Sequence, residues 1–184
     1  MADDVRDIIA RVKLLREIEE ISAETLAEEL GFDVEQYKTW EAGQEDFPIG
    51  SLVEIAVRFK VDLTELVTGK ASNLRTLCLT RAGKAPEVSR RPMYTYWNLA
   101  YNFHRKKAEP FLVEASADTE HKPISLNTHP GQEFDYVLEG RLLISVGGRE
   151  FELGPGDSLY YDSQEPHGMK AAGGAGARFL AFVF

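Results

Sequence analysis

Apolar residues in the first third of the chain recur at three- and four-residue steps, which places them on one face of an α-helix. Ile8 and Val12 begin this pattern. Ser22 and Asp33 are expected to be N-caps of two short helices, and Gly31 lies where a helix C-cap belongs. The pattern predicts five helices before residue 69.

After residue 92 the pattern changes to short apolar runs, which predict β-strands. These runs cover residues 93–98, 111–113, 134–138, 142–146 and 179–184. Glycine-rich turns separate them, and many short strands with regular turns are typical of an antiparallel sandwich or barrel. Between the two regions, residues 74–79 are predicted to form one further strand, and residues 82–92 a polar linker or arm.

We therefore predict an α+β fold in two domains. Residues 1–69 form a five-helix domain, residues 70–92 a strand and linker, and residues 93–184 an antiparallel β-barrel. The charge divides at the same place. The whole chain has a net charge of −9, and residues 1–69 hold 7 Lys and Arg against 17 Asp and Glu. This acidic balance is the opposite of that in proteins that coat nucleic acid.

Cysteine content and hydropathy restrict where the protein acts. The single cysteine, Cys78, cannot form an internal disulfide. The acidic N-terminus lacks the pattern of a signal peptide, and no apolar run approaches the ~20 residues of a membrane span. We expect a cytoplasmic protein with no membrane partner.

The two short helices on either side of Gly31 form a predicted helix-turn-helix. The pattern of residues 6–68 resembles the Xre-type (phage-repressor/Cro) DNA-binding domain. The residues that carry this resemblance are Leu26, Ala27, Gly31, Tyr37, Trp40, Glu41, Ala42, Gly43, Leu52, Ile55, Ala56, Phe59, Val61, Leu63 and Leu66.

This resemblance implies that the third helix enters the major groove of DNA. The implied DNA-contacting residues are Ser22, Val34, Glu35, Lys38 and Thr39. DNA affinity comes mostly from Lys and Arg that neutralise phosphates, yet Lys38 is the only basic residue in the range 22–43, beside six acidic ones. Two interpretations stay open: the domain binds DNA, or it serves as a dimerisation or ligand-closing module.

The strand region contains a set of metal-ligand residues. Three residues separate His129 from Glu133, and His167 follows downstream. Side chains alternate along a strand, so ligands on neighbouring strands of a barrel can meet inside it. Two histidines and one carboxylate with open positions suit Fe(II) and tolerate Zn, Mn or Ni. We predict a divalent metal and no organic cofactor. His104 and His121 lack a spaced partner and are expected at the surface.

The residues around these ligands resemble the two motifs of the cupin family. The first motif, His-x-His-x3-Glu-x6-Gly, corresponds to Asn127, His129, Glu133 and Gly140, and the second ends at His167. The resemblance covers residues 93–184 and implies a double-stranded β-helix.

One departure from the cupin pattern affects the site. Asn127 stands where the family has its first histidine, which leaves three ligands. Together with Tyr94, Tyr96 and Tyr136, Asn127 is a candidate pocket residue. Some cupins bind no metal and hold an organic ligand in the pocket instead, and this alternative stays open.

A helix-turn-helix followed by a cupin resembles the Xre-cupin transcription regulators. In that family the barrel senses a small molecule or metal, and the helical domain binds an operator as a dimer. Hydroxypropylphosphonate epoxidase, a non-haem iron enzyme, has the same domain order. Its substrate-binding lysine corresponds to the region of Glu20, whose negative charge would repel a phosphonate.

We therefore predict a DNA-binding transcriptional regulator with a small-molecule effector, in a homodimer or larger homo-oligomer, rather than an enzyme. The alternative is a mononuclear metal-dependent cupin enzyme, similar to an epoxidase or dioxygenase, whose helical domain does not bind DNA.

Overall fold

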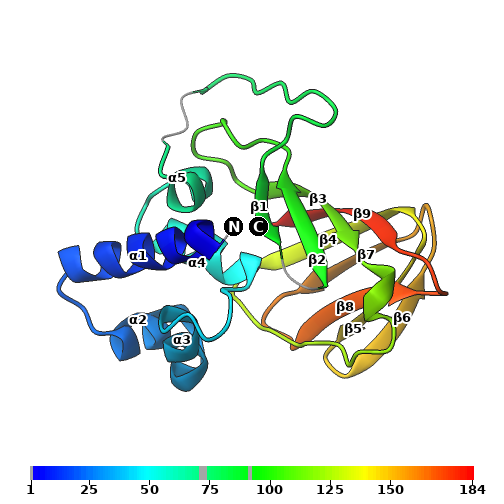
Figure 1. The fold of residues 1–184 in the computed structure, drawn as a ribbon, viewed down its shortest axis with the longest axis horizontal. Coiled ribbons are helices and arrows are strands. Elements are labelled where there is room, and N and C mark those ends of the chain that lie inside the picture. The colour runs from blue at the N-terminus through cyan, green and yellow to red at the C-terminus, as the bar shows by residue number, and fades with distance from the viewer. Residues whose placement is uncertain (1, 71–73, 91–92) are drawn as a thin grey trace.

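The computed structural model describes residues 2–70, 74–90 and 93–184, and it separates helices from strands (Figure 1). The helices are α1 (Ala2–Ile18), α2 (Ala23–Leu30), α3 (Val34–Glu41), α4 (Ile49–Arg58) and α5 (Leu63–Thr68). Within these residues, no helix combines the length and apolar composition needed to cross a membrane. The five helices expected before residue 69 are confirmed.

Local capping determines where the short helices begin and end. The Ser22 hydroxyl accepts a hydrogen bond from the Thr25 N–H at 3.1 Å, and the Asp33 carboxylate accepts one from the Gln36 N–H at 2.8 Å. Gly31 ends α2 with a φ of 69°, a left-handed conformation that glycine adopts without steric cost. The predicted caps are confirmed.

Aromatic side chains form the centre of the helical domain. Tyr37 is fully buried and packs against the rings of Phe32, Trp40 and Phe47. Its hydroxyl donates to the Glu41 carboxylate at 2.7 Å. The same carboxylate also accepts from a guanidinium of α1, so the buried polar groups of this core are paired with one another.

The strands form two antiparallel sheets. The larger sheet has the order β1-β2-β3-β9-β4-β7, and the smaller has the order β6-β5-β8. Their bounds are β1 (Glu87–Arg90), β2 (Tyr94–Asn98), β3 (Glu109–Ala115), β4 (Gln132–Glu139), β5 (Arg141–Val146), β6 (Arg149–Leu153), β7 (Ser158–Asp162), β8 (His167–Ala172) and β9 (Ala177–Val183), with a short 3-10 helix at Ala117–Thr119.

Alternation along the strands builds the core between these sheets. In β3, Phe111 and Val113 are fully buried, and Phe179 of β9 is as well. From the smaller sheet, Leu142 and Ile144 of β5 are also inaccessible to solvent. This period of two is the one expected for strands with one face on a core.

Three sequence expectations differ from the structure. In the described residues the sheets do not close into one barrel, although their antiparallel pairing agrees with a cupin. The strand expected at residues 74–79 is absent from the described residues: Leu74 makes one bridge, to Phe103, and Leu77 and Leu79 are exposed. Part of the expected linker instead forms β1, which pairs with β2.

The domain boundary expected at residues 92–93 falls beside residues 91–92, which lie outside the described residues.

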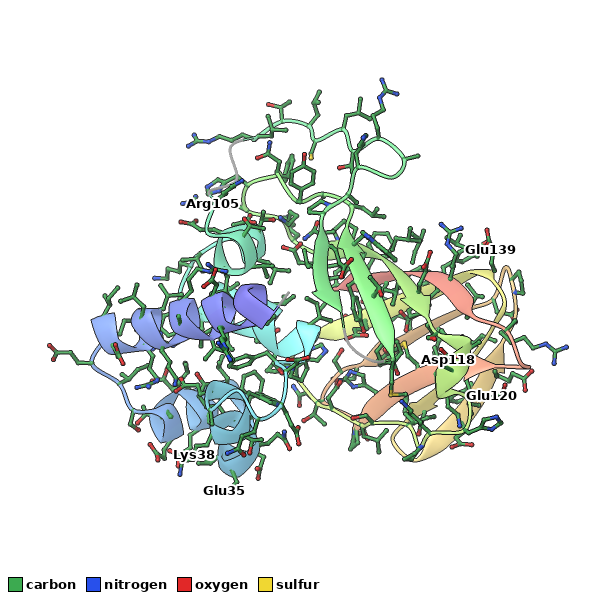
Figure 2. The ribbon with its side chains drawn as sticks, in the orientation of Figure 1. Glu35, Lys38, Arg105, Asp118, Glu120 and Glu139 are labelled. Carbon is green, nitrogen blue, oxygen red and sulfur yellow. The ribbon has the colours of Figure 1, made fainter. Side chains whose placement is uncertain are left out.

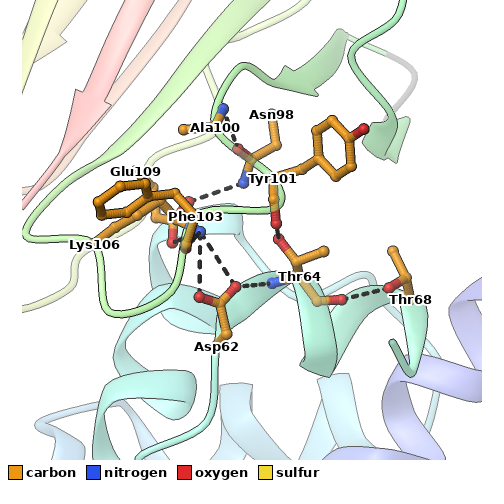
Figure 3. A network of polar contacts seen from close by, with 9 residues as sticks. All are labelled: Asp62, Thr64, Thr68, Asn98, Ala100, Tyr101, Phe103, Lys106 and Glu109. Carbon is orange, nitrogen blue, oxygen red and sulfur yellow. Dashed lines mark hydrogen bonds and ion pairs between the residues drawn. The ribbon is translucent and has the colours of Figure 1, made fainter. Parts of the chain in front are cut away.

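A buried ion cluster joins the two domains (Figure 3). The ammonium of Lys106 lies 3.2 Å from Asp62 Oδ1, at the start of α5, and 3.3 Å from Glu109 Oε1, at the start of β3. The side chains of Lys106 and Asp62 are each 5% exposed. Next to them, the Thr64 hydroxyl donates to the backbone carbonyl of Tyr101. The cluster therefore connects α5 directly to the loop that leads into β3.

Burial raises the pKa of Glu109 to about 7, and the opposing effects of the Lys106 charge and the Asn98 hydrogen bond do not cancel it. The folded state therefore holds a proton that the unfolded state releases at lower pH. Stability must fall as pH rises from the ordinary carboxyl pKa through about 7.

We expect Glu109→Gln to remove this part of the pH dependence. Between pH 5 and 7, the free energy of unfolding of the wild type should fall relative to the variant by up to about 1.4 kcal/mol per pH unit. Urea unfolding at pH 5, 6, 7 and 8 measures this difference. Glu65→Gln, at an exposed carboxylate of α5, is the control and should keep the wild-type slope. Equal slopes for Glu109→Gln and the wild type would contradict the assignment.

Candidate functional site

Three predicted metal ligands meet between the two sheets. Glu133 lies on β4 of the larger sheet, His167 begins β8 of the smaller sheet, and His129 precedes β4. One ligand atom from each residue lies within 4.8 Å of the other two, and all three residues are buried. The fold therefore brings together the three residues that the sequence analysis predicted as metal ligands.

Backbone carbonyls fix the orientation of both imidazoles. His129 Nδ1 lies 2.9 Å from the carbonyl oxygen of Pro130, and His167 Nδ1 lies 2.8 Å from that of Glu165. A carbonyl only accepts, so each Nδ1 carries a proton and donates. The Nε2 atoms then face Glu133 Oε1, at 2.7 Å from His129 and 3.6 Å from His167. This arrangement of two Nε2 atoms and one carboxylate oxygen fits a divalent transition metal.

The charge state of Glu133 is set by these neighbours. Its burial favours the neutral acid, but hydrogen bonds from His129 and His167 outweigh burial and lower the pKa of Glu133. For His129, burial favours the neutral ring, but the hydrogen bond and charge of Glu133 raise its pKa. Glu133 is therefore the anion of the site.

A second carboxyl group supports Glu133 through a tyrosine. The Tyr161 hydroxyl lies 2.7 Å from Glu133 Oε2 and 3.1 Å from Asp135 Oδ2. Burial, and then the Glu133 charge, raise the pKa of Asp135, so the neutral acid is favoured there relative to an exposed carboxyl group. Burial likewise raises the pKa of Tyr161. Asp135 was not predicted as a site residue, although its position two residues from Glu133 places it on the same face of the strand.

The predicted pocket residues divide into two groups. Asn127, Tyr94 and Tyr96 line the same cavity as Glu133 and His167, and this cavity has a volume of about 50 Å³. Asn127 Nδ2 lies 3.2 Å from His167 Nε2, and the Tyr94 hydroxyl donates to a backbone carbonyl of β8. Tyr136 does not line this cavity and is 38% exposed, because it lies on the opposite face of β4 from Glu133.

The N-terminus of α4 forms one wall of the cavity that Glu133 and His167 line, which we call the metal cavity. Pro48, Ile49 and Gly50 all line it. A Cβ atom at Gly50 would overlap the imidazole of His129, so only glycine permits this approach of helix to ring. One turn further, Glu54 is half-buried, and burial raises its pKa against the opposing charge of His129. Sequence reasoning missed this wall, because the contact joins residues from two domains.

The candidate DNA-contacting face lies at the outer end of the helical domain, away from the strands, where Figure 2 shows Glu35 and Lys38. The Glu35 side chain is 84% exposed. Ser22 caps α2, Val34 is partly buried at the start of α3, and the Thr39 hydroxyl donates to the backbone carbonyl of Glu35 at 2.9 Å. Among the residues that the structure describes, the cupin domain leaves Glu35 and Lys38 exposed.

The single lysine of this face is held by carboxylates. Lys38 Nζ lies 2.9 Å from Glu24 Oε1 and 3.2 Å from Glu35 Oε1. The hydrogen bond from Lys38 lowers the pKa of Glu24 to about 2, and hydrogen bonds to Glu24 and Glu35 raise the pKa of Lys38. These pairs reduce the positive charge that α3 presents to solvent.

Comparisons with known proteins agree with this architecture. Residues 9–72 match the family model of a helix-turn-helix domain, and residues 116–183 match that of a cupin domain. A curated relative, an uncharacterized protein of Methanocaldococcus jannaschii, is 28% identical over 75 residues, which are 41% of this chain. The match spans 60% of the length of that relative.

Two types of solved structure cover nearly the whole chain. An HTH_3 family transcriptional regulator from Vibrio cholerae superimposes with a TM-score of 0.64 at 20% identity, over 97% of this chain and 96% of that one. Hydroxypropylphosphonic acid epoxidase from S. wedmorenis superimposes with a TM-score of 0.53 at 24% identity, over 98% of both chains. At these identities the likeness shows the fold alone. The chain thus joins an N-terminal helix-turn-helix domain of the Xre type to a C-terminal cupin domain.

Proposed function

We propose that this protein is a DNA-binding transcriptional regulator whose cupin domain binds a small-molecule effector through a divalent metal. The observation that carries the proposal is that α4, a helix of the DNA-binding domain type, forms a wall of the metal cavity. The same helix thus belongs to both the ligand site and the domain that would contact an operator.

His129, Glu133 and His167 would hold the metal, for which Fe, Zn, Mn and Ni are the candidates. A metal with three protein ligands keeps coordination positions open, and an effector with a donor atom would bind there. Tyr161, which also contacts Asp135, keeps the Glu133 carboxylate oriented, since ligand orientation depends on such outer hydrogen bonds.

The size of the cavity supports coupling to the helical domain. A volume of about 50 Å³ is well below the roughly 300–1,000 Å³ that is usual for small-molecule sites. An effector of that usual size must therefore displace part of the wall, where Gly50 packs closely against the His129 ring. Arg58, at the end of α4, forms an ion pair with Glu29 of α2 at 2.7 Å, so displacement of α4 is transmitted to the helix-turn-helix.

Operator recognition by this domain class uses two copies, whose recognition helices reach successive turns of the major groove. The proposal therefore includes a homodimer, in which displacement of α4 changes the spacing of the two α3 helices. Exposure of Glu35 and Lys38 in this structure supports an accessible recognition face.

One observation favours a second candidate function, a metal-dependent cupin enzyme whose helical domain does not bind DNA. The only lysine of α3 is paired with Glu24 and Glu35, which weakens attraction to phosphates. Metal content together with DNA titration separates the two. Salt-dependent DNA binding supports the regulator, and stoichiometric metal without DNA binding at any salt concentration supports the enzyme.

Loss of one ligand should abolish metal binding. We expect His167→Ala to weaken affinity for Zn²⁺ by more than about 100-fold, since loss of an outer-shell partner alone costs 10–100-fold. Competition with a chelating dye measures the dissociation constant. His121→Ala removes an exposed histidine and is the matched control. Unchanged affinity in His167→Ala would refute the ligand set.

Gly50→Ala tests whether the helical domain controls the metal centre. The new methyl group must displace the buried His129 ring, so we expect metal affinity to fall by at least about tenfold. Ser51→Ala is the control in the same turn, because the Ser51 hydroxyl is buried without a hydrogen-bond partner among the described residues. Both variants are compared by metal titration and circular dichroism. A folded Gly50→Ala protein with wild-type affinity would contradict the coupling.

Neutralising the carboxylates around Lys38 should strengthen DNA binding. We expect Glu24→Gln with Glu35→Gln to raise affinity for genomic DNA fragments at 50 mM salt about tenfold, because Lys38 is released and two negative charges are removed. Gel-shift titration of wild type and variant measures this change. Glu65→Gln with Glu17→Gln alters exposed carboxylates outside α2 and α3 and serves as the charge-matched control. An equal gain in the control would show that only net charge matters.

A further inference from the structure

A second cavity lies between the two domains, outside the metal site. Its volume is about 370 Å³, within the usual range for small-molecule sites. The walls come from α4, α5, the loop of residues 104–108, and the end of the chain at Phe184. Among the described residues, Val183 alone lines both this cavity and the metal cavity. We call this second cavity the interdomain cleft.

Basic residues concentrate in the interdomain cleft, although the whole chain is acidic. Its lining includes Lys60, Arg105, Lys106 and Lys107. Lys106 is paired with the two buried carboxyl groups described above, those of Asp62 and Glu109, which also line the cleft. The other three cations have no carboxylate partner among the described residues, so the cleft keeps an excess of positive charge.

The backbone holds two of these cations in an unusual conformation. In the described chain, only three non-glycine residues have a positive φ, and Lys60 at 56° and Arg105 at 54° are two of them. A left-handed backbone is unfavourable for residues with a Cβ atom, and glycine would remove the strain at either position. At Lys60 this conformation belongs to the end of α4, because the Lys60 and Val61 N–H groups donate to the carbonyls of Val57 and Ala56. At Arg105 it lies in the turn of the loop that lines the cleft. Figure 2 shows Arg105 beside α5.

The remaining lining is apolar and partly open to solvent. Val57 of α4 is 66% exposed, and Phe184 is 46% exposed. Val53, Ala56 and Val61 complete this surface. A ligand with only a charged group would leave this apolar surface exposed to water. A purely apolar ligand would leave the cations without a partner. The complementary ligand has an apolar body and one acidic group.

We propose that the interdomain cleft is a second ligand site, which binds a small amphipathic carboxylate. Lys60, Arg105 and Lys107 hold its acid group, and Val57 and Phe184 contact its apolar body. Such a ligand contacts both domains at once, so its binding stabilises their relative position. The proposal does not depend on a metal at the cupin site or on DNA binding.

Octanoate is the test ligand, and 1-octanol is its uncharged counterpart. The full chain, labelled with ¹⁵N, is titrated with each and followed by amide NMR shifts. We expect octanoate to shift the amides of residues 57–63 and 104–109 and to leave those of His129 and His167 unchanged. We expect 1-octanol to bind at least about tenfold more weakly. Shifts confined to the metal cavity, equal affinity for the two ligands, or no octanoate binding would overturn the proposal.

Reversing the charge of two cleft lysines provides a second test of the proposal. We expect Lys60→Glu with Lys107→Glu to weaken octanoate binding by at least about tenfold. Lys122→Glu reverses an exposed charge outside the cleft and should change the affinity less than about twofold. Circular dichroism checks that each variant is folded, and Arg105→Gln replaces the double variant if the latter is not. Wild-type affinity in the folded cleft variant, or an equal loss in Lys122→Glu, would refute the assignment.

Discussion

The contact between the N-terminus of α4 and the imidazole of His129 is the constraint on which the arrangement of the two domains depends. Because Gly50 has no side chain, the helix approaches the ring directly and closes the cavity that holds the metal-ligand residues. A cupin domain alone would leave this side open to water. The helical domain is therefore a structural part of the ligand site, and any change in the site alters the surface on which α4 packs.

Buried charges reinforce this junction from the other side of the interface. Lys106 is shared by Asp62 of the helical domain and Glu109 of the cupin domain, and the candidate metal site likewise holds a carboxylate between two histidines. Desolvating a charge can cost more free energy than an imperfect pair returns, so the presence of these clusters is weak evidence for added stability. They fix which surfaces meet, while the buried aromatic and aliphatic side chains supply most of the favourable free energy.

Electrostatics and fold give different indications about DNA. The helix-turn-helix presents α3 to solvent, yet Lys38 is paired with two carboxylates, whereas unpaired cations gather in the interdomain cleft. Unpaired positive charge is therefore present at the domain junction, while the lysine of the recognition helix is paired. A regulator with this distribution would bind an operator weakly and with a shallow dependence on salt, because few phosphates would be neutralised, and its ligands would act mainly on the geometry between domains.

The sequence by itself determined the features that obey local rules. Caps such as Ser22 and Asp33 bond to N–H groups three residues away, and alternation along a strand placed Glu133 where it could meet His129 and His167. Tertiary structure alone decided the open pair of sheets, the strand β1 in the expected linker, and the exposure of Tyr136. It also decided the wall formed by Gly50 and the cleft formed by Lys60 and Arg105. These features join residues far apart in the chain, and no local spacing records which distant surfaces pack together.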